Sequence, residues 1–260
     1  MKLSIITINY NNHEGLKKTI PSVLSQTFKD FEYIIIDGNS TDGSKTLIEK
    51  HTSQIDYWVS EPDNGIYDAM NKGIKQAKGD YCMFLNSGDY LLDSKILEEV
   101  FQNSTGEDIL YGDLKSDYRE YIYPKQITLN TFYKGTIPHQ ASFIKTELFT
   151  TYGNYDESYP IIADWVFFVK AILVHQVSYH HMDLYISFFE HGGVSTQEQH
   201  MEQMNKDRSE LFMELFPRIF PDYIKMMSTI DQQKSDLNSY RNSRLIQWMR
   251  NLQTKILKTR

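Results

Sequence analysis

The first ninety residues alternate short, wholly apolar runs with longer stretches in which apolar positions recur at helical spacing. The apolar runs predict strands covered on both faces, at Leu3 to Ile8, at Tyr33 to Ile36 and from Tyr81 onward. The stretches between them predict helices over about Glu14 to Ser25, from the N-capping cluster Thr41 to Ser44, and over about Gly65 to Ala77. This alternation is typical of a doubly wound α/β sheet.

The rest of the chain is less regular, and the pattern predicts a mixed sheet. Strands are expected at 109–111, 121–123, 141–144 and 184–189, and helices at 147–152 and 164–173. Beyond Gln197 the chain is expected to be helical to its end, with breaks at Pro217 and Pro221.

Composition indicates a folded protein with one main core, because 40% of its 260 residues are hydrophobic and 23% are charged. The single cysteine, Cys82, lies inside an apolar run, which excludes an intramolecular disulfide and a cysteine-based zinc site. The apolar run at the N-terminus of the chain turns polar at Thr7, which makes it too short for a signal peptide. No segment of the chain reaches transmembrane length. These features predict a cytoplasmic protein.

The net charge of −7 is unevenly distributed. Residues 241–260 hold six basic residues and no acidic residue, so the first 240 carry 21 basic and 34 acidic residues. Apolar residues recur at helical spacing in this tail, at Leu245, Trp248, Met249, Leu252 and Ile256. The tail is expected either to lie on an anionic membrane surface or to pack on the main domain or a second copy of the chain.

Two carboxylates follow predicted strands. Asp89 ends the run from Tyr81 through Asn86, Ser87 and Gly88, which places it at the carboxyl edge of the sheet, where open α/β sheets bind ligands. A carboxylate there suits a divalent cation, although a turn or a helix N-cap would use the same residue. Asp37 follows the second strand and precedes a Gly-containing turn, a position suited to a base or ribose contact or to a capped turn.

Other nucleotide-binding classes are disfavoured by the first turn. Residues 7–12 read Thr-Ile-Asn-Tyr-Asn-Asn, which lacks the G-x-G-x-x-G fingerprint of dinucleotide enzymes, and the chain contains no P-loop. No feature predicts nucleic-acid binding.

Over roughly its first 195 residues the chain resembles the inverting nucleotide-sugar glycosyltransferases of family 2, which have the GT-A fold. The resemblance is carried by the first strand, by the segment Tyr33 to Ser44, by Asn64-Gly65 with Ala69, Asn71 and Gly73, and by Leu85 to Asp89. It implies a Rossmann-like mixed sheet with a donor half at about 1–90 and an acceptor half at about 91–200. Residues 201–260 would form a helical extension.

The resemblance also implies roles for residues on the donor side. The end of the first strand, with Thr7 and Asn9, would line the nucleotide site, and the second strand and turn, with Asp37 and Asn39, would contact the base, commonly uracil. Many family members have an arginine where Met70 stands. That departure leaves Lys72, beside Asn71, as the candidate contact to the diphosphate.

The metal and the catalytic base follow from the same resemblance. Leu85 to Asp89 stands where the family has a D-x-D motif and keeps only the final acid, so Asp89 would hold Mn²⁺ or Mg²⁺ while Asn86 or Ser87 contacts ribose or a metal-bound water. Asp164, in Ala163-Asp164-Trp165, matches the general base that removes the acceptor's proton, although a helix cap would also place an aspartate there.

Three further segments complete the predicted site. His191, in Glu190-His191-Gly192-Gly193, is a candidate second metal ligand or diphosphate contact, with a plain loop histidine as the alternative. His139 and Gln140 could bind sugar hydroxyls or serve a structural loop. Trp165, beside the proposed base, is the aromatic residue singled out for stacking on a saccharide.

The resemblance therefore implies a hexosyl- or N-acetylhexosaminyltransferase that uses a UDP-sugar and a saccharide or lipid-linked saccharide acceptor in bacterial surface-polysaccharide synthesis. Such an enzyme would be cytoplasmic, either free or peripheral at the inner face of the cell membrane. A sugar-phosphate nucleotidylyltransferase is the enzymatic alternative, but residues 7–15 lack its Gly-rich basic loop. A catalytically silent carbohydrate-binding protein is the other alternative.

Overall fold

The computed structural model describes residues 1–193 and 198–241. The chain divides into two compact units, Met1–Arg208 and a second that starts at Ser209. The basic tail predicted to bind a membrane or a protein lies, beyond Arg241, outside the described residues.

The first half of the large unit follows the predicted alternation closely. Its strands are β1 (Leu3–Asn9), β2 (Phe31–Asp37), β3 (Tyr57–Ser60) and β4 (Tyr81–Phe84). Its helices are α1 (His13–Leu24), α2 (Ser44–Lys50), the short 3₁₀ turn η1 (Thr52–Gln54) and α3 (Ile66–Gln76). Strands β1 and β4 are buried along their whole length, because helices cover both faces of the sheet.

The second half contains shorter elements. Its strands are β5 (Tyr90–Leu91), β6 (Ile109–Lys115), β7 (Glu120–Tyr121), β8 (Ser142–Lys145) and β9 (Tyr179–Phe188). Its helices are α4 (Ile96–Asn103), α5 (Leu129–Lys134), η2 (His139–Ala141), α6 (Thr146–Tyr152), α7 (Ala163–Phe168), η3 (Val169–Val174) and the start of α8 (Glu198–Leu215). The smaller unit contains α9 (Phe220–Arg241).

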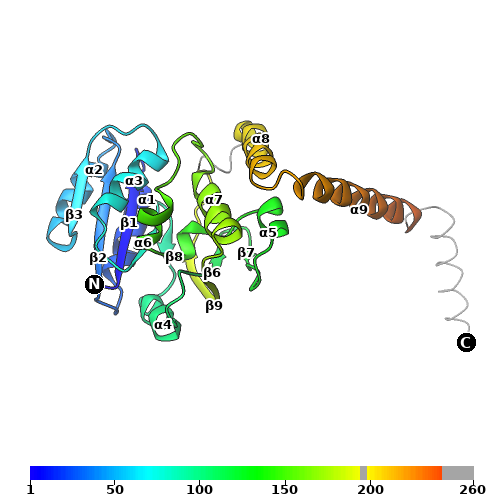
Figure 1. The fold of residues 1–260 in the computed structure, drawn as a ribbon. Helices are drawn as coiled ribbons and strands as arrows, with labels where there is room; N and C mark the ends of the chain where they lie inside the picture. Colours follow the sequence, from blue (N-terminus) through cyan, green and yellow to red (C-terminus); the bar gives the residue numbers. More distant parts are fainter. Residues whose placement is uncertain (194–197, 242–260) are drawn as a thin grey trace, which may run out of the picture. The chain divides into compact units, whose positions relative to one another are not determined.

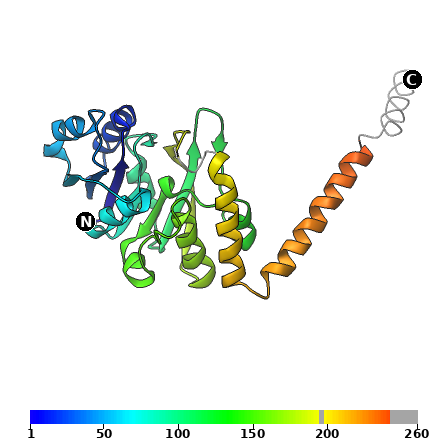
Figure 2. The ribbon, with the colours of Figure 1, turned by 90° about the horizontal axis from the view of Figure 1, so that it is seen from above.

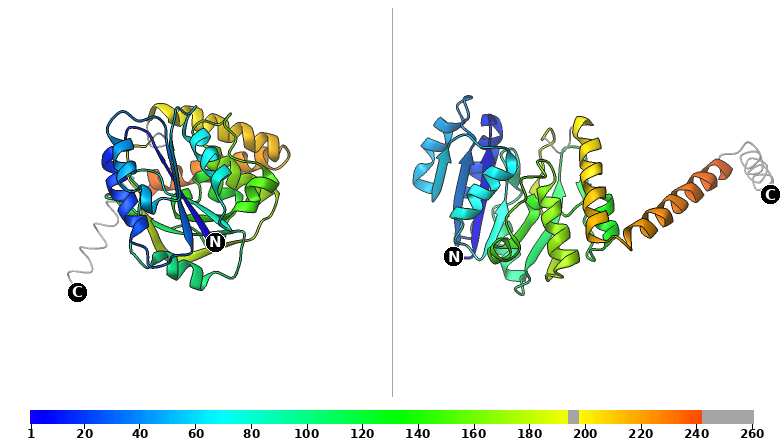
Figure 3. Two further views of the ribbon diagram at one scale, coloured as in Figure 1. Left: turned by 90° about the vertical axis from the view of Figure 1, so that its left-hand side faces the viewer. Right: turned by 45° about the horizontal axis from the view of Figure 1, so that its top comes forward.

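Within the described residues, nine strands form one mixed sheet in the order β3-β2-β1-β4-β8-β6-β9-β5, with β7 paired to β6. Figure 1 shows β3, β2 and β1 side by side at one end, with β6, β7 and β9 toward the other. Strands β1 to β4 pair in parallel, whereas β8 runs antiparallel to both β4 and β6. In Figure 2, α1 lies on one face of the sheet and α3, α6 and α7 lie on the other. The end-on view in Figure 3 agrees for α1 and α3.

The register of the sheet collects polar side chains at one edge. Asn9 pairs with Asp37 at the ends of β1 and β2, and Asp37 pairs with Ser60 at the end of β3. Because β5 pairs antiparallel with β9, the pair Tyr90 and Phe188 brings the segment after β4 beside the segment after β9. Residues from both halves of the chain therefore meet at the carboxyl edge of β1 and β4.

The structure differs from the predicted elements in several respects. The expected helix over 164–173 is α-helical only to Phe168 and continues as the π-helix η3. Pro217 does separate α8 from α9, but Pro221 lies inside the first turn of α9. Proline is tolerated there because a first-turn residue has no intrahelical acceptor for its N–H. Strands β3 and β5 and helices α4 and α5 were not predicted, because Tyr57–Ser60 has no buried residue and the other three elements are short.

Candidate active site

The turn that carries Asp89 is held in place by α1. The Asp89 N–H donates to the Asn86 carbonyl (3.0 Å), and Gly88 adopts a φ of 107°, which a side chain would strain. The Thr19 hydroxyl accepts the Gly88 N–H (3.0 Å) and donates to the Asp89 carbonyl (2.7 Å). Helix α1 therefore fixes the backbone from which the Asp89 carboxyl projects.

The Asp89 carboxyl is buried, with 5% of the residue exposed, and no basic side chain among the described residues forms an ion pair with it. Burial raises its pKa to about 7, although the Glu190 N–H, which donates to Asp89 Oδ1 (2.9 Å), and the charge of His139 oppose that rise. An acid held this way binds a proton readily near neutral pH. When ionised, it provides a negative charge that no basic side chain compensates and that a cation could neutralise.

Asp164 lies in the first turn of α7 and is fixed by two partners from distant parts of the chain. The Tyr67 hydroxyl donates to Oδ1 (2.6 Å), and His139 Nδ1 lies 2.9 Å from Oδ2. Burial acts to raise the pKa of Asp164, but the hydrogen bond and charge of His139, helped by Tyr67, outweigh it and lower the pKa. The carboxylate therefore stays ionised at neutral pH, and each oxygen keeps a lone pair for a further proton.

His139 has the complementary behaviour. Burial lowers its pKa, but the hydrogen bond to Asp164 and the charges of Asp164 and Asp89 raise it overall. Its Nε2 lies 3.3 Å from the Asn86 amide nitrogen. The histidine thus connects the turn that carries Asp89 with the helix that carries Asp164.

Three adjoining cavities surround these residues. The first, of about 330 Å³, lies at the end of β1 and the start of α3 and is lined by Asn9, Tyr10, Asn12, Gly65, Asn86 and Ser87, among others. The second, of about 410 Å³, shares Asn12, Asn86 and Ser87 with the first and adds Asp89, Asp164 and His191. The third, of about 150 Å³, shares Asp164, His139 and Gln140 with the second and adds Tyr121, Trp165 and Arg208. Asp164 and His139 therefore form the boundary between the second and third cavities.

The residues predicted to hold the metal and the acceptor all line these cavities. His191 lies in the second cavity, with its Nε2 3.1 Å from the Tyr121 hydroxyl. Gln140 lines the second and third cavities, and its backbone carbonyl accepts a hydrogen bond from the Ser187 hydroxyl (2.6 Å). Trp165 lines the third cavity, and its indole N–H donates to the carbonyls of Phe132 and Gly135, which fixes the ring.

The residues predicted to bind the donor are divided. Asn9, Asn86 and Ser87 line the first cavity, and Asn86 and Ser87 also line the second. Asp37 is fully buried and accepts hydrogen bonds from Asn9, from the Ser60 hydroxyl, and from both the backbone and the hydroxyl of Ser40. It shapes the end of β2 and lies behind Asn9, so a contact with a base stays a prediction.

The remaining predicted donor residues line none of the three cavities, and three of them bind other parts of the protein. Thr7 donates to the Leu85 carbonyl (2.7 Å), and Asn39 is exposed in the turn after β2. Asn71 donates to the Tyr155 carbonyl and the Glu157 carboxylate (2.9 Å each). Lys72 contacts Glu61 (3.1 Å) and Asp68 (3.4 Å), so the cation expected to reach the diphosphate is paired with acids on its own surface.

The donor set around Asp89 fits a hard divalent cation that takes most of its ligands from a substrate. Within residues 1–193 and 198–241, no cluster of three His, Cys, Asp or Glu side chains is placed to hold a metal. A nucleoside diphosphate would have to provide the other oxygens, as Mg²⁺ commonly requires when a protein offers one or two ligands. Asp89 and His191 are the residues at this cavity that would hold such an ion.

Sequence reasoning did not find Tyr67, Arg208 or Glu190. Tyr67 follows Gly65 by two residues and reaches Asp164 only because α3 and α7 pack on the same face of the sheet. Arg208 lies in α8, whose weak apolar periodicity does not indicate which side chains face a cavity. Glu190 lies within the predicted segment, and its backbone and side chain contact Asp89 and Lys18 respectively.

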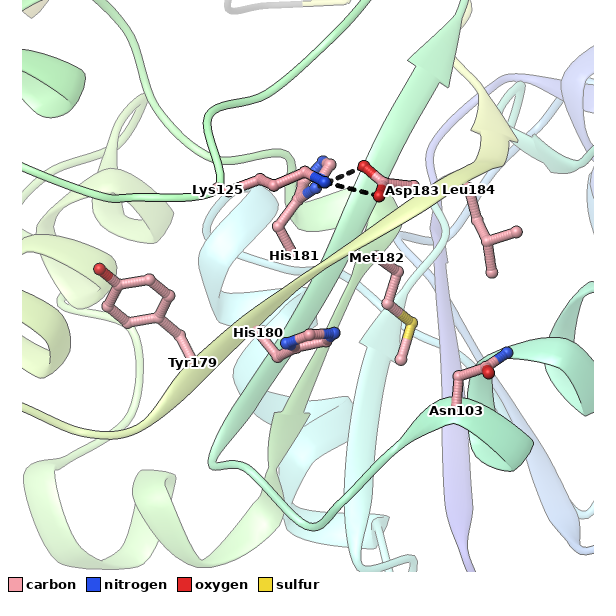
Figure 4. Close-up of a pocket in the computed structure, with 8 residues that line it drawn as sticks. All are labelled: Asn103, Lys125, Tyr179, His180, His181, Met182, Asp183 and Leu184. Carbon is pink, nitrogen blue, oxygen red and sulfur yellow. Dashed lines mark hydrogen bonds and ion pairs between the residues drawn. The ribbon is translucent and has the colours of Figure 1, made fainter.

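A separate cavity of about 410 Å³ lies along the first half of β9 and is lined by none of the predicted site residues. Figure 4 shows Lys125 pointing toward Asp183 above the strand, and their ion pair spans 2.6 Å. His181, beneath them, is bonded through Nε2 to Asp113 (2.9 Å). The candidate active site lies beyond the other end of β9.

This fold is that of a GT-A glycosyltransferase, and comparison with known proteins shows the family. The model for glycosyl transferase family 2 matches residues 4–150, more than half of the chain. The chain therefore belongs to glycosyltransferase family 2, which decides against the nucleotidylyltransferase alternative.

Individual relatives agree with this assignment. An uncharacterised glycosyltransferase of Mycobacterium tuberculosis is 33% identical over 190 residues, which cover 66% of this chain and 69% of that one. The poly(ribitol-phosphate) beta-N-acetylglucosaminyltransferase TarP of Staphylococcus aureus is 34% identical over 155 residues, 57% of this chain and 46% of TarP. The solved structure of Staphylococcus aureus TarS 1-349 in complex with UDP-GlcNAc superimposes with a TM-score of 0.64 at 19% identity, over 81% of this chain and 65% of the TarS chain.

The described helices include none that is long and apolar enough to cross a membrane.

Proposed function

We propose that this enzyme transfers one sugar from a nucleoside diphosphate donor, with UDP as the nucleotide, to a hydroxyl of a saccharide or lipid-linked saccharide, with inversion at the anomeric carbon. One observation carries the proposal: an ionised, buried carboxylate, Asp164, lies between the second cavity, which contains the candidate cation site, and the third cavity, which has aromatic walls. Direct displacement needs this arrangement, because the acceptor oxygen must attack from the side opposite the leaving diphosphate.

In this proposal the first cavity holds the nucleotide and the second holds the diphosphate and the sugar. Asn86 and Ser87 line both cavities, so they lie where the nucleotide and diphosphate would join. A bound cation, held by Asp89 with His191 as the candidate second ligand, would neutralise the leaving diphosphate. The donor supported first is UDP-GlcNAc, because the relative TarP is named as an N-acetylglucosaminyltransferase and TarS binds UDP-GlcNAc.

Asp164 has the role of general base. It takes the proton of the acceptor hydroxyl while that oxygen forms a bond to the anomeric carbon and the bond from that carbon to the diphosphate breaks. Tyr67 and His139 position the carboxylate, and their hydrogen bonds keep it ionised until the hydroxyl arrives. Each hydrogen bond to a charged group contributes about 1.5–3 kcal/mol, so the two together limit the carboxylate to one orientation.

The biological setting is proposed from the relatives. One is a PGL/p-HBAD biosynthesis glycosyltransferase, 30% identical over 200 residues, and another is TarP. Both names place the transfer of sugars onto cell-envelope molecules within the range of this family. We infer a similar role for this chain, with the basic tail as a candidate anchor to an anionic membrane surface.

Binding of the donor tests the proposal. UDP and UDP-GlcNAc, each with Mn²⁺, should raise the melting temperature of the protein, and the shift should disappear when EDTA removes the metal. ADP is the matched control, because it carries the same diphosphate with a different base. Stabilisation by ADP equal to that by UDP, or no metal dependence, would contradict the proposed donor site.

A further inference from the structure

A cationic side chain lies in the third cavity without an anionic partner. Arg208, on α8, places its guanidinium carbon 5.4 Å from the centroid of the Trp165 ring. Its Nε is buried and has no hydrogen-bond partner, and Arg208 forms no ion pair among the residues that the structure describes. Arg208 is half-buried as a whole, so part of its guanidinium has lost water without gaining an anion, which is costly.

The electrostatics agree with the geometry. Burial lowers the pKa of Arg208, and the charge of Asp164 acts in the opposite direction. Asp164 forms its hydrogen bonds with Tyr67 and His139 and makes no ion pair with Arg208. The cavity therefore contains a positive group that an oxyanion from outside could pair with.

The position of Arg208 assigns that oxyanion to the acceptor. Arg208 and Trp165 line the third cavity and neither of the other two, whereas Asp89 and His191 line the second. A donor diphosphate bound near Asp89 would lie on the other side of Asp164 and His139. A group that pairs with Arg208 would share a cavity with the catalytic face of Asp164, where the acceptor hydroxyl must lie.

A second arginine lies close to the same cavity. The Arg119 guanidinium carbon lies 4.3 Å from the centroid of the Tyr121 ring, and Tyr121 lines the third cavity. Arg119 also forms no ion pair within the described part of the chain. By contrast, Lys115 and Lys125, nearby in the sequence, are both paired with acids. Two unpaired arginines stacked on aromatic rings thus flank one cavity in an acidic protein.

We propose that the third cavity is an acceptor subsite for an anionic saccharide or polyol, whose phosphate or carboxylate group binds Arg208 while its hydroxyl is presented to Asp164. This inference rests on the proposed transfer reaction. A guanidinium matches either oxyanion through paired N–H donors, and Trp165 and Tyr121 provide apolar walls for the carbon skeleton.

Matched pairs of small probes test the subsite without any variant. Calorimetric titration compares glycerol 3-phosphate with glycerol and glucuronic acid with glucose, using the full chain without nucleotide and free of divalent metal. Omitting the metal prevents an anion from binding through a cation at Asp89. We expect at least one anionic probe to bind about tenfold to a hundredfold more tightly than its neutral partner, which corresponds to one charged hydrogen-bonded pair.

The variant Arg208→Met tests the residue, because methionine keeps an apolar side chain over Trp165 and removes the charge. It should abolish the preference for the anionic probe, while Arg208→Lys should retain part of it. Lys75→Met, which removes a positive charge from an exposed position on α3, should leave the preference unchanged. UDP binding in each variant reports whether the donor half is folded.

The outcomes separate this inference from the proposed function. A phosphate preference identifies a phosphorylated acceptor, and a carboxylate preference identifies a uronic acid. Equal binding of anionic and neutral probes to the parent, or an unchanged preference in Arg208→Met, overturns the inference. If the parent releases no UDP from any nucleotide sugar, the proposed transfer fails, whatever the probes show.

Discussion

The buried carboxyl of Asp89 gives a prediction whose size follows from its surroundings. Replacing it with asparagine keeps its shape and its acceptor for the Glu190 N–H but removes the charge. Folding raises the pKa of this group from 3.8 to about 7, a difference of about three units, and each unit corresponds to about 1.4 kcal/mol. In the metal-free protein, ionising Asp89 therefore costs about 4 kcal/mol of folding stability.

The sign of the effect depends on pH. Because the folded-state pKa is the higher one, the folded protein keeps its proton longer than the unfolded chain does. Ionisation of Asp89 therefore does not lower the folding stability of the parent below about pH 4, and it lowers that stability progressively as the pH rises to 7. Asn cannot ionise, so the stability of Asp89→Asn relative to the parent should increase by about 3 kcal/mol between pH 5 and pH 8.

Urea unfolding in EDTA at pH 5 and pH 8 measures this increase directly. The control Asp30→Asn replaces an exposed carboxylate before β2 and should show no comparable increase. Adding Mn²⁺ and UDP should reverse the order at pH 8, because the cation stabilises the parent and has no carboxylate in the variant. A stability difference that is the same at both pH values would refute the idea that Asp89 is a desolvated, unpaired acid. Equal stabilisation by Mn²⁺ and UDP in both proteins would show that the cation binds elsewhere.

Two further predictions concern the base and the tail. Tyr67→Phe removes the hydroxyl that donates to Asp164 (2.6 Å), so the pKa that governs the acidic limb of the pH–rate profile should rise by about one unit. If that pKa does not change, either Asp164 or this hydrogen bond has no part in the ionisation that governs the rate. Deleting residues 241–260 should weaken binding to anionic vesicles in a salt-dependent way and spare turnover on a soluble acceptor, since each basic residue contributes about 1 kcal/mol near an anionic surface. Loss of solubility or of oligomeric state on deletion, with no vesicle binding by the full chain, would instead favour a packing role.

The strands and helices of the first half could be predicted because their signals are local. Wholly apolar runs bounded by polar turns predicted β1, β2 and β4, and their parallel order carried Asp89 and Asp37 to one edge of the sheet. The second half was harder, because its strands are short and several pair antiparallel with partners distant in sequence. Strand β3 was not predicted, because it lies at an edge of the sheet and has no buried residue.

The candidate site shows the same division. Motif order predicted that Asp89, His139, Asp164 and His191 would share a site, and the second cavity brings all four together. The contact between Tyr67 and Asp164 joins α3 to α7 across the fold, and no spacing in the sequence predicts it. Likewise, the partners that engage Lys72 depend on neighbours that only the folded chain provides.

The central claim is that Asp164 is the base of a glycosyl transfer, and the most direct test measures UDP release and donor binding together. The parent and Asp164→Asn are compared with UDP-GlcNAc, Mn²⁺ and a panel of anionic and neutral acceptors. We expect the parent to release UDP and the variant to do so about a hundredfold or more slowly, while the donor dissociation constant of the variant stays within about twofold of the parent's. A variant that turns over at nearly the parent's rate would contradict the assignment of the base. A parent that binds UDP-GlcNAc but neither transfers nor hydrolyses it would instead indicate a silent carbohydrate-binding protein.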